Sequence, residues 1–416
     1  MTLLLRSRSP HSVPEWRPEI RFLLEQLGAT GLSHPGSSRD VAPGGLDWDY
    51  LLGAATRHGV LPLLFKALSS PDSVLIPDAV MGRMRRGYGT ISRRNFILTQ
   101  ELLRLLTCLD DHGIVAVPYK GVLLAAIAYG DPSLRQFADL DILIRRKDVL
   151  KAKLLLQEQG YSARFIYGYR PLTRLSSAET DAFLKNYLEF EMQRKDGLLI
   201  DLHWQFAPRH YPFRLDPDPL LARLETFRIE GQSVSSFARE DQVLLLCLHG
   251  AKDRWEKLLW MIDLAKLIEA CPDLDWASMC TRSTDSAMEL PLLLGLSLAE
   301  TLFPGTVPRS FTERSAHREH IGRVAQSVFA GLFKKKPRAE CLPVNSLHLQ
   351  LCANWSDKVT YLARGLCVPR VQEWSMIRLP DWLYPLYYVI RPIRIMAHCA
   401  RVSIERLRIA LERHAG

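Results

Sequence analysis

The strongest constraint on the fold of this chain is a short segment in which acidic and apolar residues alternate, at positions 139–144 (DLDILI). Alternate residues of a strand point to the same face of a sheet. As a strand, the segment would direct Asp139 and Asp141 to one face, while Leu140 and Ile142 point into a core. Two such close carboxylates repel each other unless a cation lies between them. The pattern predicts a divalent metal site at the start of a strand.

A third acidic residue lies in another apolar run, at positions 198–204 (LLIDLHW). Asp201 and His203 are two residues apart and would share one face of this strand. A carboxylate buried there without a partner costs roughly several kcal/mol. A shared metal ion would offset that cost, so we expect Asp201 to join Asp139 and Asp141.

The segments around these acids predict a small mixed sheet. Asp196-Gly197 separates two strand-like runs, and an Asp-Gly pair there is typical of a β-hairpin. A second small hairpin is expected around Gly231. The expected strands cover residues 114–118, 140–144, 161–167, 187–193 and 198–206, and the expected helices cover residues 121–129 and 147–159.

Helical periodicity dominates on both sides of this region. A long helix is expected from Pro77 to about Asp111, and a helical pair at 240–252 and 257–270. The predicted fold class is α+β, a small mixed-sheet core flanked by N-terminal and C-terminal helical regions. Its expected divisions are an arm and linker at 1–45, a helical region at 46–112, the α/β core at 113–237 and a second helical region at 238–416.

Charge and cysteine usage limit the class of protein. The 54 basic and 45 acidic residues give a net charge of +9, which suits an anionic ligand such as a nucleotide, an anionic polymer or a membrane surface. The eight cysteines form no C-x-x-C pair, which argues against a zinc site or a disulfide framework. No apolar signal-peptide core follows Met1, and no apolar run reaches the ~20 residues of a membrane-spanning helix. We therefore expect a cytoplasmic protein with reduced thiols.

Several motifs in combination resemble a known superfamily. A glycine at the head of a helix, a D-x-D motif and a third aspartate on a later strand resemble the DNA polymerase beta-type nucleotidyltransferases. More narrowly, the chain resembles the bacterial family labelled "nucleotidyltransferase family protein", over roughly residues 46–270. The residues that carry this resemblance are Lys120-Gly121, Tyr129, Asp131, Arg135, Asp139-Leu140-Asp141, Gly160-Tyr161, Asp201-Leu202-His203-Trp204, His249-Gly250, Trp260 and Asp263.

The resemblance implies a catalytic and metal-binding set formed by Asp139, Asp141 and Asp201. The first two would ligate the Mg²⁺ (or Mn²⁺) that bridges a nucleoside triphosphate such as ATP. Asp201 would join a second metal and orient or deprotonate the acceptor hydroxyl. Two metals can stabilise both the attacking and the leaving oxygens of an in-line displacement.

The resemblance also implies a set of nucleotide-binding residues. Gly121 and the amides of its helix would cradle phosphates, and Lys120 and Arg135 would supply positive charge to them. His203 and His249 complete the nucleotide-binding candidates. The superfamily usually has Gly-Ser or Gly-Gly at this loop, so Lys120 would replace the contact of the absent serine.

Structural roles compete with these functional ones. Arg135 could instead pair with Asp131 or Asp139. His249 and Asp263 could hydrogen-bond each other and fix a helix pair. This structural role is the favoured interpretation of His249 and Asp263.

Three further residues have a structural interpretation as the default. His203 could be a satisfied, half-buried histidine, a carboxylate-orienting group or a metal ligand. Glu189 and Glu191 lie on the strand before the hairpin, where an exposed edge is expected.

The predicted function is that of a metal-dependent nucleotidyltransferase, which moves a nucleoside monophosphate or a related phosphoryl unit onto a hydroxyl or phosphate acceptor. The acceptor is left open between a peptide, a sugar, a metabolite, a protein side chain and an RNA end. The alternatives are a catalytically degenerate binding or regulatory module (antitoxin-like or an assembly partner) and a nucleic-acid-end modifier. The basic, aromatic C-terminal tail is expected to be a docked helix, with peripheral membrane contact as the less favoured interpretation.

Overall fold

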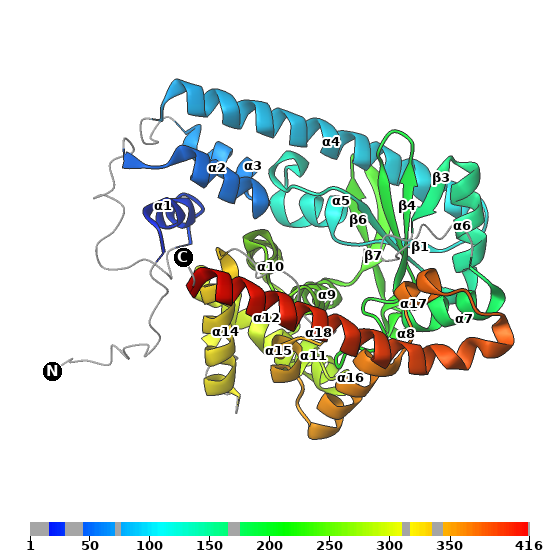
Figure 1. Ribbon diagram of the computed structural model, residues 1–416. Helices are drawn as coiled ribbons and strands as arrows, with labels where there is room; N and C mark the ends of the chain where they lie inside the picture. The colour runs from blue at the N-terminus through cyan, green and yellow to red at the C-terminus, as the bar shows by residue number, and fades with distance from the viewer. Residues whose placement is uncertain are drawn as a thin grey trace.

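The computed structural model describes residues 16–29, 45–70, 76–164, 175–309, 317–334 and 344–414. A central sheet is flanked by helices on both sides, with the long helix α4 along one side of the molecule and α18 across the other (Figure 1). The predicted α+β class is confirmed.

The central sheet has five strands in the order β1-β2-β5-β4-β3. Only β2 and β5 are parallel, and the three other pairings are antiparallel. All five residues of β2 are buried, because neighbouring strands and helices cover both of its faces. The strands are β1 (Ala116–Pro118), β2 (Leu140–Ile144), β3 (Tyr161–Arg164), β4 (Glu189–Arg194) and β5 (Leu199–His203), and a separate ribbon pairs β6 (Leu224–Ile229) with β7 (Gln232–Phe237).

The Asp-Gly turn sets the register of the hairpin formed by β4 and β5. The Arg194 amide donates to the carbonyl of Leu198, and Gly197 adopts φ +88°, a left-handed conformation that favours glycine. The ladder then pairs Glu191 with Asp201 and Glu189 with His203. Both predicted hairpins are confirmed.

Short helices and turns connect the strands of the core. The expected strand at 114–118 begins only at Ala116, and a 3₁₀ turn over Arg146–Asp148 precedes the helix expected at 147–159. The end of the strand expected at 161–167 lies outside the described residues. The connecting elements are α5 (Gly121–Leu124) with a π-helical turn (Ala125–Tyr129), a 3₁₀ turn (Pro132–Leu134), α6 (Val149–Glu158), α7 (Ser177–Asn186) and α8 (Pro217–Leu221).

The N-terminal helices link the two apolar cores of the molecule. Val80 and Met84 near the start of α4 pack in the core of the helical region, whereas Leu102 and Leu109 near its end pack against the sheet. Ile20 of the first helix is buried in the helical core as well. These helices are α1 (Pro18–Gln26), α2 (Trp48–Arg57), α3 (Leu61–Leu68) and α4 (Asp78–Asp110).

The C-terminal helices first build the helical core and then return to the sheet. Val371, Trp374 and Tyr387 belong to the same buried cluster as the sheet residues. No helix in the described ranges is long and apolar enough to cross a membrane. The helices are α9 (Arg239–Lys252), α10 (Leu258–Ala270), α11 (Trp276–Asp285), α12 (Glu289–Leu302), α14 (Arg318–Leu332), α15 (Ser346–Gln350), α16 (Trp355–Cys367), α17 (Val371–Met376), a 3₁₀ segment (Asp381–Leu386) and α18 (Tyr387–His414).

Candidate metal and nucleotide site

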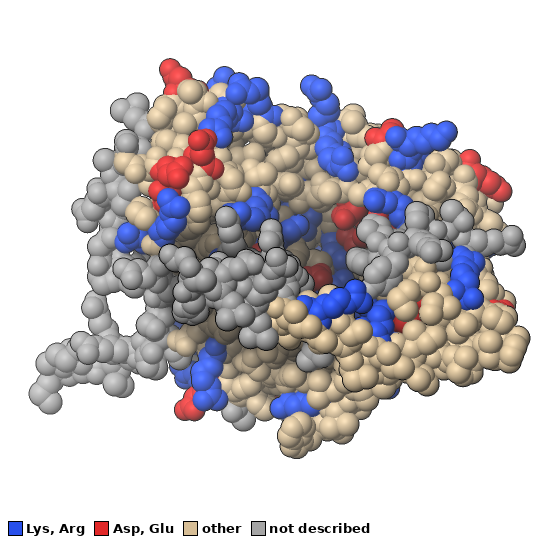
Figure 2. Space-filling view, viewed as in Figure 1, with Lys and Arg blue, Asp and Glu red and all other residues tan. Residues whose placement is uncertain are grey.

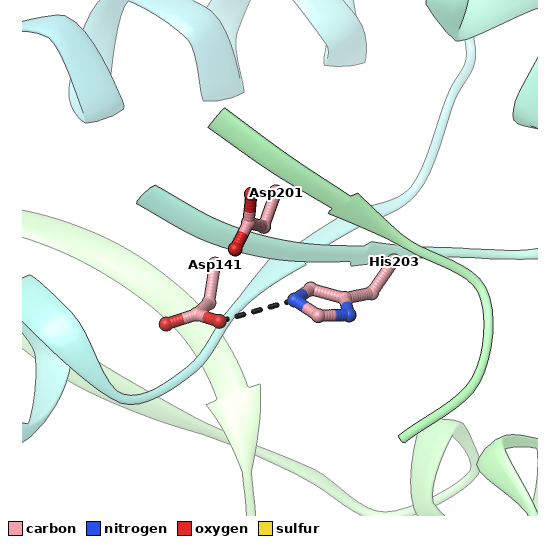
Figure 3. Close-up of side chains that lie close together, drawn as sticks. All are labelled: Asp141, Asp201 and His203. Carbon is pink, nitrogen blue, oxygen red and sulfur yellow. Dashed lines mark hydrogen bonds and ion pairs between the residues drawn. The ribbon is translucent and has the colours of Figure 1, made fainter. Parts of the chain in front are cut away.

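Two predicted acids and one histidine meet on one face of the sheet. Asp141 and Asp201 are partners in the parallel register of β2 and β5, and His203 lies two residues further along β5. One ligand atom from each of the three lies within 4.8 Å of the others. Figure 3 shows Asp141 and His203 facing each other with the Asp201 carboxylate beside them. Carboxylates and imidazole are common ligands of divalent cations, so this donor set fits a metal ion.

Acidic groups hold His203 on both of its ring nitrogens. Nε2 lies 3.0 Å from Oδ1 of Asp141, and Nδ1 lies 3.0 Å from Oε2 of Glu189. The Tyr119 ring packs edge-on against the imidazole at a centroid distance of 5.3 Å. The ring is buried, and these carboxylates fix its orientation, as neighbouring carboxylates do for metal-binding histidines.

Lys120 supplies a cation to the same carboxylate. Its Nζ lies 3.0 Å from Oδ1 of Asp141, and the amide of the preceding Tyr119 donates to the Asp141 carbonyl over 3.2 Å. The Lys120 backbone adopts φ 56° and ψ −143°, a region that costs a non-glycine residue about 1–3 kcal/mol. This strained turn directs the ammonium group to the acids.

The two acids of the cluster, Asp141 and Asp201, have pKa values shifted in opposite directions. Burial alone would raise the pKa of Asp141, but the charges and hydrogen bonds of Lys120 and His203 hold it well below its usual range. Burial raises the pKa of Asp201 to about 9, with further contributions from Glu189, Asp141 and Asp139. Asp201 therefore keeps a proton at neutral pH until a cation offsets the surrounding negative charge.

Asp139 lies beside this cluster rather than in it. Strand β2 begins at Leu140, so Asp139 precedes the strand instead of sharing its regular face with Asp141. Burial and the Asp141 charge raise the pKa of the Asp139 carboxyl. Among the described residues, the group that could hold a metal ion consists of Asp141, Asp201 and His203. The sequence predicted Asp139 as its third member.

Gly121 begins the short helix α5 next to the acids. It adopts φ +32°, and a Cβ at this position would lie 3.5 Å from the Asp139 carbonyl oxygen. The turn therefore brings the start of α5 close to the strand that carries the aspartates. Amide groups in the first turn of a helix have no partner within the helix and can donate hydrogen bonds to phosphate oxygens.

Arg135 is part of a buried ion pair with a residue of α10. Its Nε and Nη2 donate to the two carboxylate oxygens of Asp263 over 2.9 and 2.8 Å, and Tyr129 donates its hydroxyl to Oδ1 over 2.6 Å. The expected partners Asp131 and Asp139 are therefore wrong, since Asp131 instead accepts from the Ser133 amide and hydroxyl.

The Arg135 pair also supports the loop in front of α5. Nη1 lies 3.4 Å from the carbonyl oxygen of Gly121, so the buried guanidinium connects α10 to the turn at the start of α5. Its side chain is 7% exposed and that of Asp263 is fully buried. Asp263 occupies one edge of the guanidinium, and the direct contact of Arg135 with phosphate stays a prediction.

The family comparison covers this entire site. A family model described as "Uncharacterised nucleotidyltransferase" matches residues 44–304, which is more than half of the chain. The chain belongs to this nucleotidyltransferase family.

Two solved structures resemble parts of this nucleotidyltransferase. The solution structure of the antibiotic-resistance factor ANT(2'')-Ia is 12% identical over 46% of this chain and 91% of its own, with a TM-score of 0.31. The crystal structure of an antigenic nucleotidyltransferase-like protein from Paracoccidioides brasiliensis is 17% identical over 52% of this chain and 95% of its own, with a TM-score of 0.26. A comparison with curated proteins gave no significant match.

His249 of the nucleotidyltransferase has a different partner from the expected one. Its Nδ1 lies 3.0 Å from Oδ2 of Asp253, one turn further along, whereas Asp263 is bound to Arg135. The predicted hydrogen bond between His249 and Asp263 is therefore wrong. Burial lowers the pKa of His249 to about 4, and the positive charge of Lys120 adds to this effect. The imidazole is thus neutral at physiological pH.

Glu189 contributes to the site, although the sequence did not predict this contact. It was expected at an exposed edge, but its carboxylate lies against His203 and contributes to the raised pKa of Asp201. The Asp-Gly turn contained the necessary signal, because counting outward from it pairs Glu189 with His203.

One face of the molecule is hollowed. Figure 2 shows acidic and basic side chains in the floor of a depression between the α4 side and the α18 side of the molecule. Such mixed charge in a recess suits a ligand that is anionic and is bound together with cations.

Proposed function

We propose that this family member is a metal-dependent nucleotidyltransferase. It would move a nucleoside monophosphate, or a related phosphoryl unit, from a nucleoside triphosphate to a hydroxyl or phosphate acceptor. The observation that carries the proposal is the convergence of Asp141, Asp201 and His203 beside Lys120. Their ligand atoms form a compact oxygen and nitrogen donor set, and Asp201 there has a raised pKa that a cation would lower.

The ligands of the divalent ion in this proposal are Asp141, Asp201 and His203, with Asp139 beside them. A bound Mg²⁺ or Mn²⁺ would polarise the phosphoryl oxygens of the triphosphate. The nitrogen of His203 makes Mn²⁺ a suitable alternative to Mg²⁺, which prefers oxygen ligands.

The remaining residues bind and position the triphosphate in this proposal. Lys120 places its ammonium group against the phosphates, and the amides at the start of α5, from Gly121 onward, donate to a phosphate oxygen. Arg135 positions this turn through the Gly121 carbonyl. His249 lies close enough to influence the site electrostatically and would contact the nucleotide as a neutral donor.

Asp201 is the residue that faces the acceptor. A bound cation would lower the pKa of Asp201, and the carboxylate that then forms would be available to take up a proton. The acceptor oxygen forms a bond to the α-phosphorus, the bond to the bridging oxygen breaks and pyrophosphate leaves. The hydroxyl proton passes to Asp201.

A labelling experiment tests this function directly. The full-length chain is incubated with Mg²⁺, cell extract and each of the four triphosphates labelled at the α-phosphate. Transfer of label to one class of molecule by the wild type, and its loss in Asp141→Asn with Asp201→Asn, supports the proposal. Binding of no triphosphate by the wild-type chain would reject it.

One observation favours the degenerate alternative. The Lys120 ammonium already pairs with Asp141, and a lysine that permanently occupied this place would replace the metal rather than bind phosphate. A binding or regulatory module of this kind would bind no divalent cation, and removing the lysine would restore cation binding. Titrations of a divalent cation into the wild type and into a Lys120 variant therefore separate the two functions.

A further inference from the structure

A cavity lies beside the acids, along strand β4 next to the Asp201 strand β5. Its volume is about 280 Å³, and it is lined by strand β4, the end of α7, the end of α9 and the start of α17. Glu189 and Glu191 line it, and these residues are the register partners of His203 and Asp201.

The strand order places Asp201 between two binding regions. The Lys120-Gly121 turn follows β1 beside β2, the Asp201 strand β5 comes next, and β4 with the cavity follows it. A triphosphate bound at the turn and a molecule bound in the cavity would thus approach Asp201 from opposite sides. This is the arrangement that in-line transfer to an acceptor requires.

Three acids and three cations line the cavity, and two of the cations lie next to acids. Arg164 lies 3.0 Å from Glu191, and Lys252 lies 3.7 Å from Asp253. The third cation, Arg370, has a buried Nη2 atom without a hydrogen-bond partner among the residues that the structure describes.

The nearest acid in sequence does not compensate Arg370. The Glu373 carboxylate accepts from the Arg370 backbone amide over 2.8 Å, but its ion pairs are with the guanidinium groups of Arg391 and Arg394. Gln372, which also lines the cavity, has a buried Oε1 that lacks a partner within the described ranges. A buried donor without a partner is costly, and a charge-assisted hydrogen bond to an anionic ligand removes that cost.

Aromatic rings form the walls of the cavity. Phe183 and Tyr187 line it and are stacked on each other at a centroid distance of 4.3 Å. Tyr211 lines another side and packs against His348 at 4.8 Å. Rigid aromatic walls suit the apolar body of a small molecule, with polar groups fixed at its ends.

We propose that this cavity binds the acceptor, and that the acceptor carries a carboxylate or phosphate group held by Arg370 while its hydroxyl reaches Asp201. This inference rests on the proposed function and names the substrate class of the same reaction. The acceptor hydroxyl supplies the attacking oxygen, pyrophosphate leaves and the proton moves to Asp201. The anionic group takes no part in bond formation.

Three matched compounds test the inference by calorimetric titration into the full-length chain. All carry a phenyl ring and a secondary hydroxyl, and they end in a carboxylate (3-phenyllactate), a phosphate (2-hydroxy-3-phenylpropyl phosphate) or a neutral hydroxymethyl group (3-phenylpropane-1,2-diol). The wild type should bind at least one anionic compound at least about tenfold more tightly than the diol. The tighter of the two anions identifies the group that Arg370 holds.

Variants assign the preference to one side chain. Arg370→Gln should abolish the preference, Arg370→Lys should restore part of it, and the exposed control Arg378→Gln should leave it unchanged. Equal binding of the diol, a preference that survives Arg370→Gln, or no binding of any compound would overturn the inference. Mg²⁺-triphosphate is titrated separately, so that its failure to bind rejects the proposed function and not the anion preference.

Discussion

Asp141 and Asp201 lie directly opposite each other on the parallel strands β2 and β5, yet their carboxyl groups have opposite affinities for protons. Lys120 and His203 keep Asp141 ionised, whereas burial and three surrounding acids raise the pKa of Asp201 to about 9. The pair thus holds one negative charge and one proton in the absence of a metal ion. The predictions below follow from this imbalance and from the contacts around it.

Replacement of the protonated acid should stabilise the metal-free protein. The pKa of Asp201 is higher in the folded chain than in the unfolded one, so its contribution to stability is complete below about pH 4 and is lost as the pH rises towards 9. Asp201→Asn removes this loss and should raise the free energy of unfolding by about 1–3 kcal/mol at pH 8. Urea unfolding in EDTA at pH 5 and pH 8 measures the difference.

The gain should be smaller at pH 5 than at pH 8. The exposed Asp273→Asn serves as the matched control and should change neither value. A variant that is less stable than the wild type at both pH values would show that Asp201 is not under electrostatic strain.

Removal of the Lys120 ammonium group should weaken triphosphate binding without weakening metal binding. Lys120→Met removes the ammonium group that we assign to phosphate, so the affinity for Mg²⁺-triphosphate should fall at least about tenfold. Mn²⁺ alone should bind at least as tightly as before, because no lysine competes for Asp141. Calorimetry measures both, with the exposed Lys147→Met as control. Unchanged triphosphate affinity would exclude a phosphate contact by Lys120.

The buried pair between Arg135 and Asp263 should be important for stability. Asp263→Asn leaves a buried guanidinium partly unpaired, and the loss should be about 3–5 kcal/mol in the free energy of unfolding. The exposed pair of Lys266 and Glu269 on the same helix gives the control, where Lys266→Met should cost less than about 1 kcal/mol.

A double-mutant cycle tests whether the two charges act as a pair. Arg135→Met with Asp263→Leu should be less destabilised than the sum of the single variants, since neither charge remains without its partner. Additive losses, measured by urea unfolding, would argue against direct coupling.

The stability of the molecule in acid should depend on His58. Burial lowers the pKa of this histidine to about 4, and its Nδ1 accepts the Leu258 amide over 3.2 Å. The folded chain binds fewer protons than the unfolded chain between about pH 6.5 and pH 4, so stability falls as the pH decreases through this range. His58→Gln should reduce that fall by about 2 kcal/mol.

Thermal unfolding between pH 4 and pH 8 measures this dependence. The exposed His112→Gln provides the control and should retain the wild-type slope. An unaltered slope in His58→Gln would assign the acid sensitivity to other buried histidines, such as His348, whose pKa burial also lowers to about 4.

Local patterns in the sequence explain why much of the site was predictable. The alternation in 139–144 and 198–204 fixes which side chains share a face, and the Asp-Gly turn fixes the pairing of β4 with β5. Asp141, Asp201 and His203 follow from these two signals. The fold class follows from the same kind of pattern, because apolar residues have helical spacing before and after the sheet region and alternate within it.

Long-range partners were not predictable in the same way. Arg135 has acids nearby in sequence, yet it binds Asp263 on α10, because the tertiary packing of α10 against the π-helical turn decides the pair. The turn conformation of Lys120 was equally hidden, since φ 56° is unusual for a lysine. The alternation also did not show that His203, rather than Asp139, would complete the group with Asp141 and Asp201, since Asp139 lies just before β2.

Titration of Mn²⁺, alone and with triphosphate, tests the central claim most directly. Free Mn²⁺ is followed by electron paramagnetic resonance with the wild type, Asp141→Asn, Asp201→Asn and the control Asp273→Asn. We predict saturable binding by the wild type and the control, at least about tenfold weaker binding by both site variants, and triphosphate binding that requires the ion. Equal Mn²⁺ affinity in all four proteins, or triphosphate binding that is independent of the ion, would contradict the account.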